Sequence, residues 1–418
     1  MPMSSEGPWS PLVGAASAEA AAAIRGAGVC DGPDAGLNER LAAVGLVDHH
    51  VHGTWRGETD EAGLADMLIE SDRRSAAEAA GYDTQVWHAV RRWCAPVLGL
   101  EPSAPAASYI ERRLALGSSA VASTLLPAAG LSHLVVETGF RGDLIASPSE
   151  LGIAAGGVPA SRVVRLEALA ERLIGELGDP WTYPDAFRSA VAAELAGPDP
   201  TVGFKTILAY RGGFERDMAR PDDEAVARAA AAWSAEVHVD SGSGRGARLA
   251  DDALLRFGIW SAVDTGRPVQ VHTGFGDPDL DLHRSDPLLL TGFLRSTEGR
   301  ADVVLLHTYP FHRGAGYLAQ MFPHVYLDVG LAINYLGAAS TAVVAESMEL
   351  APFRKLLFSS DAWGAPELHL LGSWLFRRAT ARLLGEWVAR RDWSRTDAER
   401  VIDLVAGENA RRVYGLGC

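Results

Sequence analysis

Two histidines close a short apolar run near the N-terminus, in the sequence Leu46-Val47-Asp48-His49-His50-Val51-His52-Gly53. Because side chains two residues apart point to the same face of a β-strand, His50 and His52 are expected to project together. Two imidazoles held in this way can bind one divalent metal ion. A lone pair of this kind is a weak signal, but its position at the end of an apolar strand, directly before a glycine, strengthens it.

Three other apolar runs also end at a side chain that can bind a metal. They are Pro268 to His272, Val303 to His307 and Leu356 to Asp361. Any one of these end residues could instead be a buried histidine satisfied by the core, or an aspartate that caps a helix. Four strand ends that all finish in histidine or aspartate are hard to explain by packing, and together they predict a metal site.

Lys205 lies inside a further apolar run, Val202 to Leu208. Of the 38 Lys+Arg residues only Lys205 and Lys355 are lysines, so arginine is the usual cation of this chain. An ammonium group inside a strand costs free energy unless it is paired or chemically changed. Lys205 therefore either pairs with an inner carboxylate such as Glu167 or is carboxylated by carbon dioxide. Arginine cannot undergo that modification, because it stays protonated.

The elements that must position these residues are short apolar strands that alternate with longer helical stretches, such as Asp222 to Glu236, Asp251 to Thr265 and Asp397 to Tyr414. Parallel strands covered on both faces have this near-continuous apolar character. Eight such units predict an α/β fold, the (β/α)8 or TIM barrel, whose active site lies at the C-terminal ends of the strands. The predicted strands are Val44 to His52, His133 to Thr138, Arg162 to Glu167, Val202 to Leu208, Pro268 to His272, Val303 to His307, Val325 to Asp328 and Lys355 to Asp361.

Two segments exceed a minimal barrel, and we expect both to belong to a single domain that spans residues 1–418. Residues 1–42 precede the first strand and are predicted to be helical. Residues 55–131 form a helical insertion after the first strand, with Trp87 and Trp93 at near-helical spacing. We expect this insertion to cap the C-terminal mouth of the barrel; the alternative is a peripheral helical bulge.

The formal net charge of -15 argues against nucleic acid and against an anionic membrane as partners, which leaves a small-molecule substrate. Three cysteines, Cys30, Cys94 and Cys418, lie far apart without metal-binding spacing, and an odd number fits a reducing cytoplasm. Neither a signal peptide nor a transmembrane helix is predicted. Assembly into a homo-oligomer stays open.

The order of these residues resembles the amidohydrolase superfamily, with HxH on strand one, lysine on strand four, histidine on strands five and six, and aspartate on strand eight. Four runs also resemble one branch, the amidohydrolase-related domain that fungi and plants fuse to a glutamine-synthetase-like domain. The resemblance covers roughly residues 44 to 416. The four runs are Phe204 to Arg211, Gln270 to Asp277, His307 to Pro310 and Glu408 to Tyr414.

This resemblance implies one or two divalent metal ions per chain, usually zinc. In members with one metal, His272 would join the first metal and His307 would contact the substrate. In members with two metals, the carbamate of Lys205 would bridge them. The first metal would be held by His50, His52 and Asp361, and the second by His272 and His307.

The chemistry that follows is hydrolysis by water activated at the metal. Asp361 is expected to be the general base, and His307 is expected to stabilise the developing oxyanion. An arginine near a strand end could bind a substrate carboxylate through two hydrogen bonds, although a structural ion pair is the alternative. The residues predicted to contact the substrate are Arg165, Glu167, Arg211 and His312.

The predicted function is hydrolysis of a C–N, amide-type bond in a small molecule that carries a carboxylate. One alternative is a metal-dependent decarboxylase of an aromatic or unsaturated acid on the same barrel. Such members need no bridging lysine, so Lys205 favours hydrolysis. A second alternative is a binding or regulatory barrel that has lost catalysis, but loss usually removes metal ligands and the full set is present here.

Overall fold

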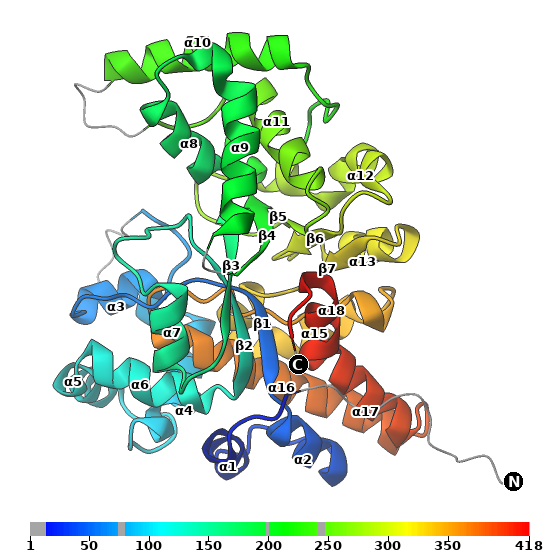
Figure 1. The fold of residues 1–418 in the computed structure, drawn as a ribbon. Coiled ribbons are helices and arrows are strands. Elements are labelled where there is room, and N and C mark those ends of the chain that lie inside the picture. The colour runs from blue at the N-terminus through cyan, green and yellow to red at the C-terminus, as the bar shows by residue number, and fades with distance from the viewer. Residues whose placement is uncertain (1–13, 74–79, 198–199, 241–246, 418) are drawn as a thin grey trace, which may run out of the picture.

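The computed structural model describes residues 14–73, 80–197, 200–240 and 247–417, which form a ring of parallel strands surrounded by helices (Figure 1). Each strand pairs with the next one in the chain, which is the strand order of a (β/α)8 barrel. The predicted fold class is thereby confirmed. The strands are β1 (Leu46–Val51), β2 (Leu131–Glu137), β3 (Ala160–Arg165), β4 (Thr201–Thr206), β5 (Val269–His272), β6 (Val303–Leu306) and β7 (Val325–Leu327).

The eighth position of the barrel is filled by an extended segment that is less regular than a strand. Leu356 forms a parallel bridge with Leu327, whose carbonyl accepts a hydrogen bond from the Leu357 amide at 3.0 Å. On the opposite edge, the His49 amide donates to the Phe358 carbonyl at 3.1 Å. This segment therefore links β7 to β1 and closes the barrel.

The predicted strand Lys355 to Asp361 needs correction at both ends. Lys355 ends a short 3-10 helix, η7 (Phe353–Lys355), and Asp361 has a positive φ of 49°. A side chain replaces part of the regular strand pairing: the buried Asp48 carboxylate accepts hydrogen bonds from the Ser360 amide at 3.0 Å and from its hydroxyl at 2.5 Å. These bonds fix the backbone just before Asp361.

Helices cover the outside of the barrel, and two precede it. The predicted helix Asp397 to Tyr414 is one continuous run of α17, a π-helical turn and α18. In chain order the helices are α1 (Ala18–Gly26), α2 (Ala35–Ala43), α3 (Glu61–Met67), α4 (Gln85–Val97), α5 (Ala106–Leu116), α6 (Ser118–Ala128), α7 (Pro148–Ala154), α8 (Leu166–Glu176), α9 (Tyr183–Ala196), α10 (Asp223–Asp240), α11 (Asp252–Val263), α12 (Thr291–Thr297), α13 (His312–Met321), α14 (Ala332–Leu336), α15 (Ser340–Ser347), α16 (Pro366–Ala389), α17 (Arg395–Asp403) and α18 (Asn409–Tyr414). Short turns of helix are η1 (Ala80–Tyr82), η2 (Pro180–Thr182), η3 (Leu208–Arg211), η4 (Leu282–Ser285), η5 (Pro287–Leu290), η6 (Gly337–Ala339) and the π-helical η8 (Leu404–Glu408). Within the described residues, no helix is long and apolar enough to cross a membrane.

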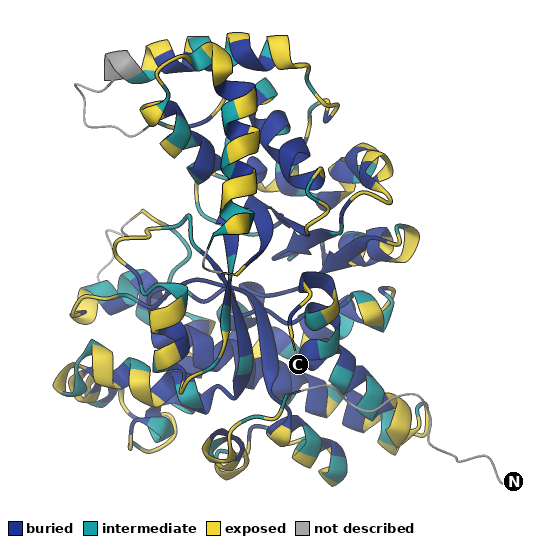
Figure 2. Ribbon diagram, viewed as in Figure 1, coloured by how far each residue is buried: buried dark blue, intermediate teal, exposed yellow. Residues whose placement is uncertain are grey.

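The strands are buried on both faces, whereas the outer helices alternate between buried and exposed residues (Figure 2). Two apolar clusters result. The smaller one fills the interior of the barrel with alternate residues of the strands, such as Val47, Val135 and Val163, and with Val413 and Tyr414 of α18. This interior is a packed core, and it leaves the C-terminal ends of the strands as the place for a polar site.

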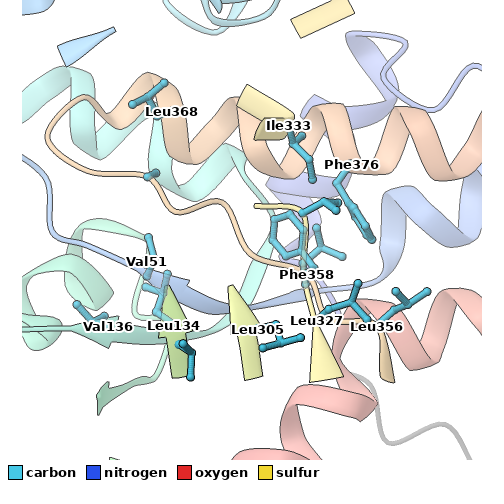
Figure 3. Packing of buried hydrophobic residues seen from close by; sticks show 14 of the residues in the cluster. Val51, Leu134, Val136, Leu305, Leu327, Ile333, Leu356, Phe358, Leu368 and Phe376 are labelled. Carbon is cyan, nitrogen blue, oxygen red and sulfur yellow. The ribbon is translucent and has the colours of Figure 1, made fainter. Parts of the chain in front are cut away.

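The larger cluster lies between the strands and the surrounding helices, and the long helix α16 is central to it. Figure 3 shows Phe358 of the closing segment beside Phe376 of α16, with a ring separation of 4.8 Å. Most of α16 is buried, including the guanidinium of Arg377, which donates to the carbonyls of Leu41, Val44 and Gly130. These bonds attach the N-terminal helices to the barrel, so the described part of the predicted N-terminal helical segment is confirmed.

The insertion after β1 has two parts with different positions. Helices α4 and α6 pack against α16, and Trp93 contacts Trp374 of that helix with a ring separation of 6.2 Å. The earlier residues Asp66 to Asp72, in and after α3, instead line a cavity at the C-terminal ends of the strands. The insertion is therefore a cap in its first part and a peripheral helical layer in its second.

A buried ion pair joins the insertion to α16. The Nε of Arg113 donates to Oε1 of Glu367 at 2.7 Å, and the hydroxyl of Tyr109 donates to the same oxygen at 3.1 Å. The two charged side chains are only 3% and 0% exposed. Since Glu367 lies six residues after Asp361, this pair also supports the closing segment of the barrel.

We predict that Arg113→Met lowers the free energy of unfolding by about 3–5 kcal/mol, because it leaves the Glu367 carboxylate buried without its cation. The double variant Arg113→Met/Glu367→Leu should recover most of that loss. Urea denaturation at 25 °C measures both. As a control, Arg228→Met removes an exposed pair with Glu224 and should cost less than about 1 kcal/mol. An Arg113→Met variant as stable as the control would contradict the proposed anchoring.

Candidate metal centre

A cavity of about 490 Å³ opens at the C-terminal ends of the strands, where this fold places its active sites. His52, Lys205, His272 and Asp361 all line it. Each comes from a different strand end: β1, β4, β5 and the closing segment. The structure thus brings together residues that are up to 309 positions apart in the sequence, from His52 to Asp361.

Asp361 is the centre of this group. Its Oδ1 lies 3.2 Å from Nε2 of His50 and 3.5 Å from Nε2 of His52, and its Oδ2 lies 3.3 Å from Nε2 of His307. Among the described residues, His50, His307 and Asp361 can offer ligand atoms within 4.8 Å of one another. All of these side chains are buried.

Lys205 and His272 complete the group. The Nζ of Lys205 lies 3.0 Å from Nε2 of His50, and the His272 ring lies 4.9 Å from the His307 ring. The alternative ion pair between Lys205 and Glu167 is not formed. Instead, Glu167 accepts hydrogen bonds from the Thr206 hydroxyl at 2.6 Å and from the Ile207 amide at 3.0 Å.

Backbone conformation also marks the site. His307 and Asp361 directly follow apolar strand segments, and both have a positive φ, 57° and 49°. Residues other than glycine rarely adopt a positive φ. Such backbone strain is found mainly at functional sites, where the surrounding structure enforces it. Here it turns both side chains inward toward the other ligands.

Hydrogen bonds behind the ligands hold their rings. The Nδ1 of His50 lies 2.8 Å from Oε1 of Gln270, and the Gln270 amide donates to the Tyr414 hydroxyl at 2.8 Å. The register of β1 shifts between Asp48 and Val51, and His49 also points inward, with its Nε2 3.0 Å from Oδ2 of Asp328. Such support fixes the orientation and tautomer of a metal-binding imidazole.

The electrostatics of the site suit neutral imidazoles around an anion. Burial lowers the pKa of His50 and of His272 well below the usual value, and it lowers the pKa of His307 to about 4. Burial alone would raise the pKa of Asp361, but the nearby imidazoles of His307, His50 and His52 hold it well below its ordinary value. Burial also lowers the pKa of Lys205.

The residues present fit a divalent metal ion. His272 Nε2, His307 Nε2 and Asp361 Oδ1 are buried polar atoms without a hydrogen-bond partner in the described part of the chain. Such atoms are costly to bury unless something binds them. Neutral imidazole nitrogens and a carboxylate oxygen are the ligand types of zinc and of similar ions.

The predicted substrate contacts divide into two pairs. Arg165 and Arg211 line the cavity, as expected, but each already bonds to a carboxylate of the protein. Arg165 donates to Glu137 at 2.6 Å, and Arg211 donates to Glu171 at 3.3 Å. Both side chains therefore form structural ion pairs, which was the alternative to substrate binding. The Nε of Arg165 nevertheless remains buried without a partner among the described residues.

The other two predicted contacts lie away from the cavity. Glu167 was placed on the third strand, but β3 ends at Arg165 and Glu167 opens α8, where its bonds to β4 hold it outside the site. His312 opens α13 and its Nε2 lies 2.6 Å from Oε2 of Glu346. Glu167 lies elsewhere than expected because the chain turns into α8 at Leu166, before the predicted strand end, and His312 lies elsewhere because it begins α13.

Several residues around the site were not predicted from the sequence. Glu137 ends β2 and lies 3.3 Å from Nδ1 of His52, so the rule that found the other strand ends could have found it. Gln270, two residues before His272 on β5, could have been noticed in the same way. Glu70 and Asp277 reach the cavity from the insertion and from the loop after β5. Asp277 ends one of the runs that resemble the family, whereas no local pattern in the sequence indicates Glu70.

Comparisons with known proteins agree with this geometry. The profile of the amidohydrolase family matches residues 180–416, which include Lys205, His272, His307 and Asp361. A curated relative, protein fluG of Emericella nidulans, is 30% identical over 281 residues, which are 61% of this chain and 32% of that protein. The chain thus spans about a third of the length of this relative.

Solved structures share the fold. A candidate metal-dependent hydrolase from Lactobacillus casei is 26% identical, with a TM-score of 0.75 over 88% of this chain and 95% of its own. A uronate isomerase from Bacillus halodurans is 15% identical, with a TM-score of 0.59 over 95% and 96%. At that identity it shows only the shared architecture. Because the profile match covers more than half of the chain, this protein belongs to the amidohydrolase family.

Proposed function

We propose that this protein is a metal-dependent hydrolase that cleaves a C–N, amide-type bond in a small molecule carrying a carboxylate. The observation that carries this proposal is the buried Asp361 carboxylate, shared by the imidazoles of His50, His52 and His307 at the mouth of the barrel. Neutral imidazole nitrogens around a carboxylate are the ligand types of a catalytic divalent metal, and such a metal activates water for hydrolysis.

Zinc is the proposed metal. When bound, a zinc ion supplies Lewis acidity toward the scissile carbonyl and makes water more acidic. His50, His52 and Asp361 would hold one ion, and His272 and His307 would hold a second. Two ions require an anionic bridge, and Lys205, 3.0 Å from His50, is placed to provide it as a carbamate. That modification joins the Nζ nitrogen to the carbon of carbon dioxide and releases one proton.

The protein's own groups account for the proton transfers. Asp361 would take a proton from the attacking water and later deliver it to the departing nitrogen, so that an amide and water become a carboxylic acid and an amine, and the acid proton then passes to the amine. If only one ion is bound, His307, whose Nε2 lies 3.3 Å from Oδ2 of Asp361, would instead donate to the oxygen on which negative charge develops. Burial of the site strengthens both interactions, because few solvent dipoles compete there.

We also infer a cytoplasmic location, since Cys30 and Cys94 are free thiols, as expected where cysteines stay reduced. Burial raises the pKa of Cys30 to about 11 and that of Cys94 well above its ordinary value, so neither thiol is set up as a nucleophile. These two cysteines therefore do not compete with the metal centre as a catalytic site.

We predict that protein purified without chelators and incubated with zinc retains about one to two equivalents per chain in elemental analysis. Lys205→Arg should remove any second equivalent, because a guanidinium cannot form a carbamate. Lys355→Arg changes the other lysine, which lies outside the site, and should bind zinc like the wild type. Less than about a tenth of an equivalent in the wild type would contradict the metal centre.

Asp361→Asn should reduce kcat at least about 100-fold, because an amide cannot act as the base. Its thermal unfolding should stay close to that of the wild type. Asp281→Asn is the control, since that carboxylate is 66% exposed on the surface, and it should keep full activity. An Asp361→Asn variant with wild-type turnover would show that the base lies elsewhere.

The bond attacked can be identified with a panel of amides and aromatic acids in oxygen-18 water. Hydrolysis predicts one labelled oxygen in the new product carboxylate and release of an amine. A decarboxylase would release carbon dioxide from an aromatic acid, and the organic product would contain no labelled oxygen. Carbon dioxide release without cleavage of any amide would replace hydrolysis by decarboxylation as the function of this centre.

A further inference from the structure

The cavity that contains the metal centre has walls of opposite charge. One wall carries carboxylates, Glu70 from the insertion and Asp277 from the loop after β5. The other wall carries the guanidinium groups of Arg141, Arg165 and Arg211. A substrate in this cavity is therefore exposed to an anionic and to a cationic surface at once.

Most of the cationic wall is already neutralised by the protein. The exception is Arg141, which has no carboxylate within ion-pair distance in the described ranges and lies over the rings of Phe140 and Trp363, at 5.2 Å and 4.7 Å. It is the guanidinium best able to take a substrate carboxylate. The neutralised pairs are Arg165 with Glu137, Arg211 with Glu171 and Arg248 with Asp279.

The anionic wall differs, because neither Glu70 nor Asp277 has a cationic partner within ion-pair distance among residues 14–73, 80–197, 200–240 and 247–417. Burial raises the pKa of Glu70 well above its ordinary value, and the nearby Asp361 and Asp277 raise it further, whereas Lys205 and a hydrogen bond with Tyr335 lower it. Burial also raises the pKa of Asp277. Keeping both carboxyl groups ionised in this place is costly as long as no cation lies at ion-pair distance.

A cationic group of the ligand would remove this cost. An ammonium group donates up to three hydrogen bonds and can bridge two carboxylates, each of which gains a charge-assisted bond. The phenol ring of Tyr210 lies between this wall and His272. Its hydroxyl is 3.4 Å from the Asp277 amide nitrogen, and its ring centre is 4.6 Å from that of His272. The anionic wall is thus continuous with the metal ligands and belongs to the same binding cavity.

We propose that Glu70 and Asp277 form a subsite for an ammonium group of the substrate, while Arg141 takes its carboxylate. This inference rests on the proposed function, because the ligand is the molecule whose C–N bond is cleaved. The substrate class is then an amide that carries both a carboxylate and a protonated amine. The strand ends supply the reacting groups, and the insertion together with the loop after β5 supplies the selectivity for the positive charge.

Two matched pairs of probes test the subsite, and the members of each pair differ in the ammonium group alone. N-(4-aminobutyl)succinamate is compared with N-pentylsuccinamate, and γ-glutamyl-propylamide with glutaryl-propylamide. Calorimetric titration of zinc-loaded Asp361→Asn gives affinities without turnover, and kcat/KM is measured on the active enzyme. In at least one pair, the ammonium member should be favoured by about 10- to 100-fold, the range of a charge-assisted hydrogen bond.

Glu70→Gln and Asp277→Asn should each remove most of this preference and leave the uncharged probes within about 3-fold. Glu61→Gln is the matched control, an exposed carboxylate on the same insertion and outside the cavity, and it should keep the full preference. Equal affinity for both members of both pairs, or a preference that survives Glu70→Gln, overturns the subsite.

The measurements distinguish failure of the proposed subsite from failure of the proposed hydrolase function. If neither the probes nor any other amide is hydrolysed but Glu70 still determines a calorimetric preference for the ammonium member, the subsite stands and the hydrolase function fails. If amides are hydrolysed without any preference for the ammonium member, the function stands and the subsite fails.

Discussion

The carboxylate of Asp361 lies in the interior at 3.2, 3.5 and 3.3 Å from three imidazole nitrogens, of His50, His52 and His307. Such a group is expensive to bury, and a positive φ at Asp361 adds strain to that cost. Its position therefore has to be enforced from outside. The Asp48 carboxylate does so by accepting two hydrogen bonds from Ser360, the residue before Asp361.

The ligands are held jointly rather than one strand at a time. Gln270 links the ring of His50 to Tyr414, a residue of the C-terminal helix that also fills the interior of the barrel. Asp328 accepts hydrogen bonds from the His307 amide and contacts the ring of His49. The same hydrogen bonds consequently join the packed interior of the barrel to the polar site above it. A substitution in the interior should therefore also shift the candidate ligands.

The helical insertion adds what a bare barrel lacks. Its outer helices are attached to α16 through the Arg113–Glu367 pair, and its first part contributes Glu70 to the cavity. The candidate reacting groups are thus fixed by strand ends, while a connecting segment adds a carboxylate to the cavity wall. This division is common in barrels, where the loops after the strands can vary without disturbing the core.

The fold class could be predicted from the sequence, and so could the six residues, from His50 to Asp361, that the structure brings together at the candidate metal centre. Each of them lies in or ends an apolar run, and parallel strands bring their ends to one edge, so a local pattern was enough. The remaining positions depend on long-range packing. Glu167 lies outside the cavity because α8 begins at Leu166, before the predicted end of the third strand, and His312 lies outside it because it begins α13. Glu70 lies at the cavity because packing against distant helices sets the path of the insertion. Such long-range contacts leave no local periodicity in the sequence.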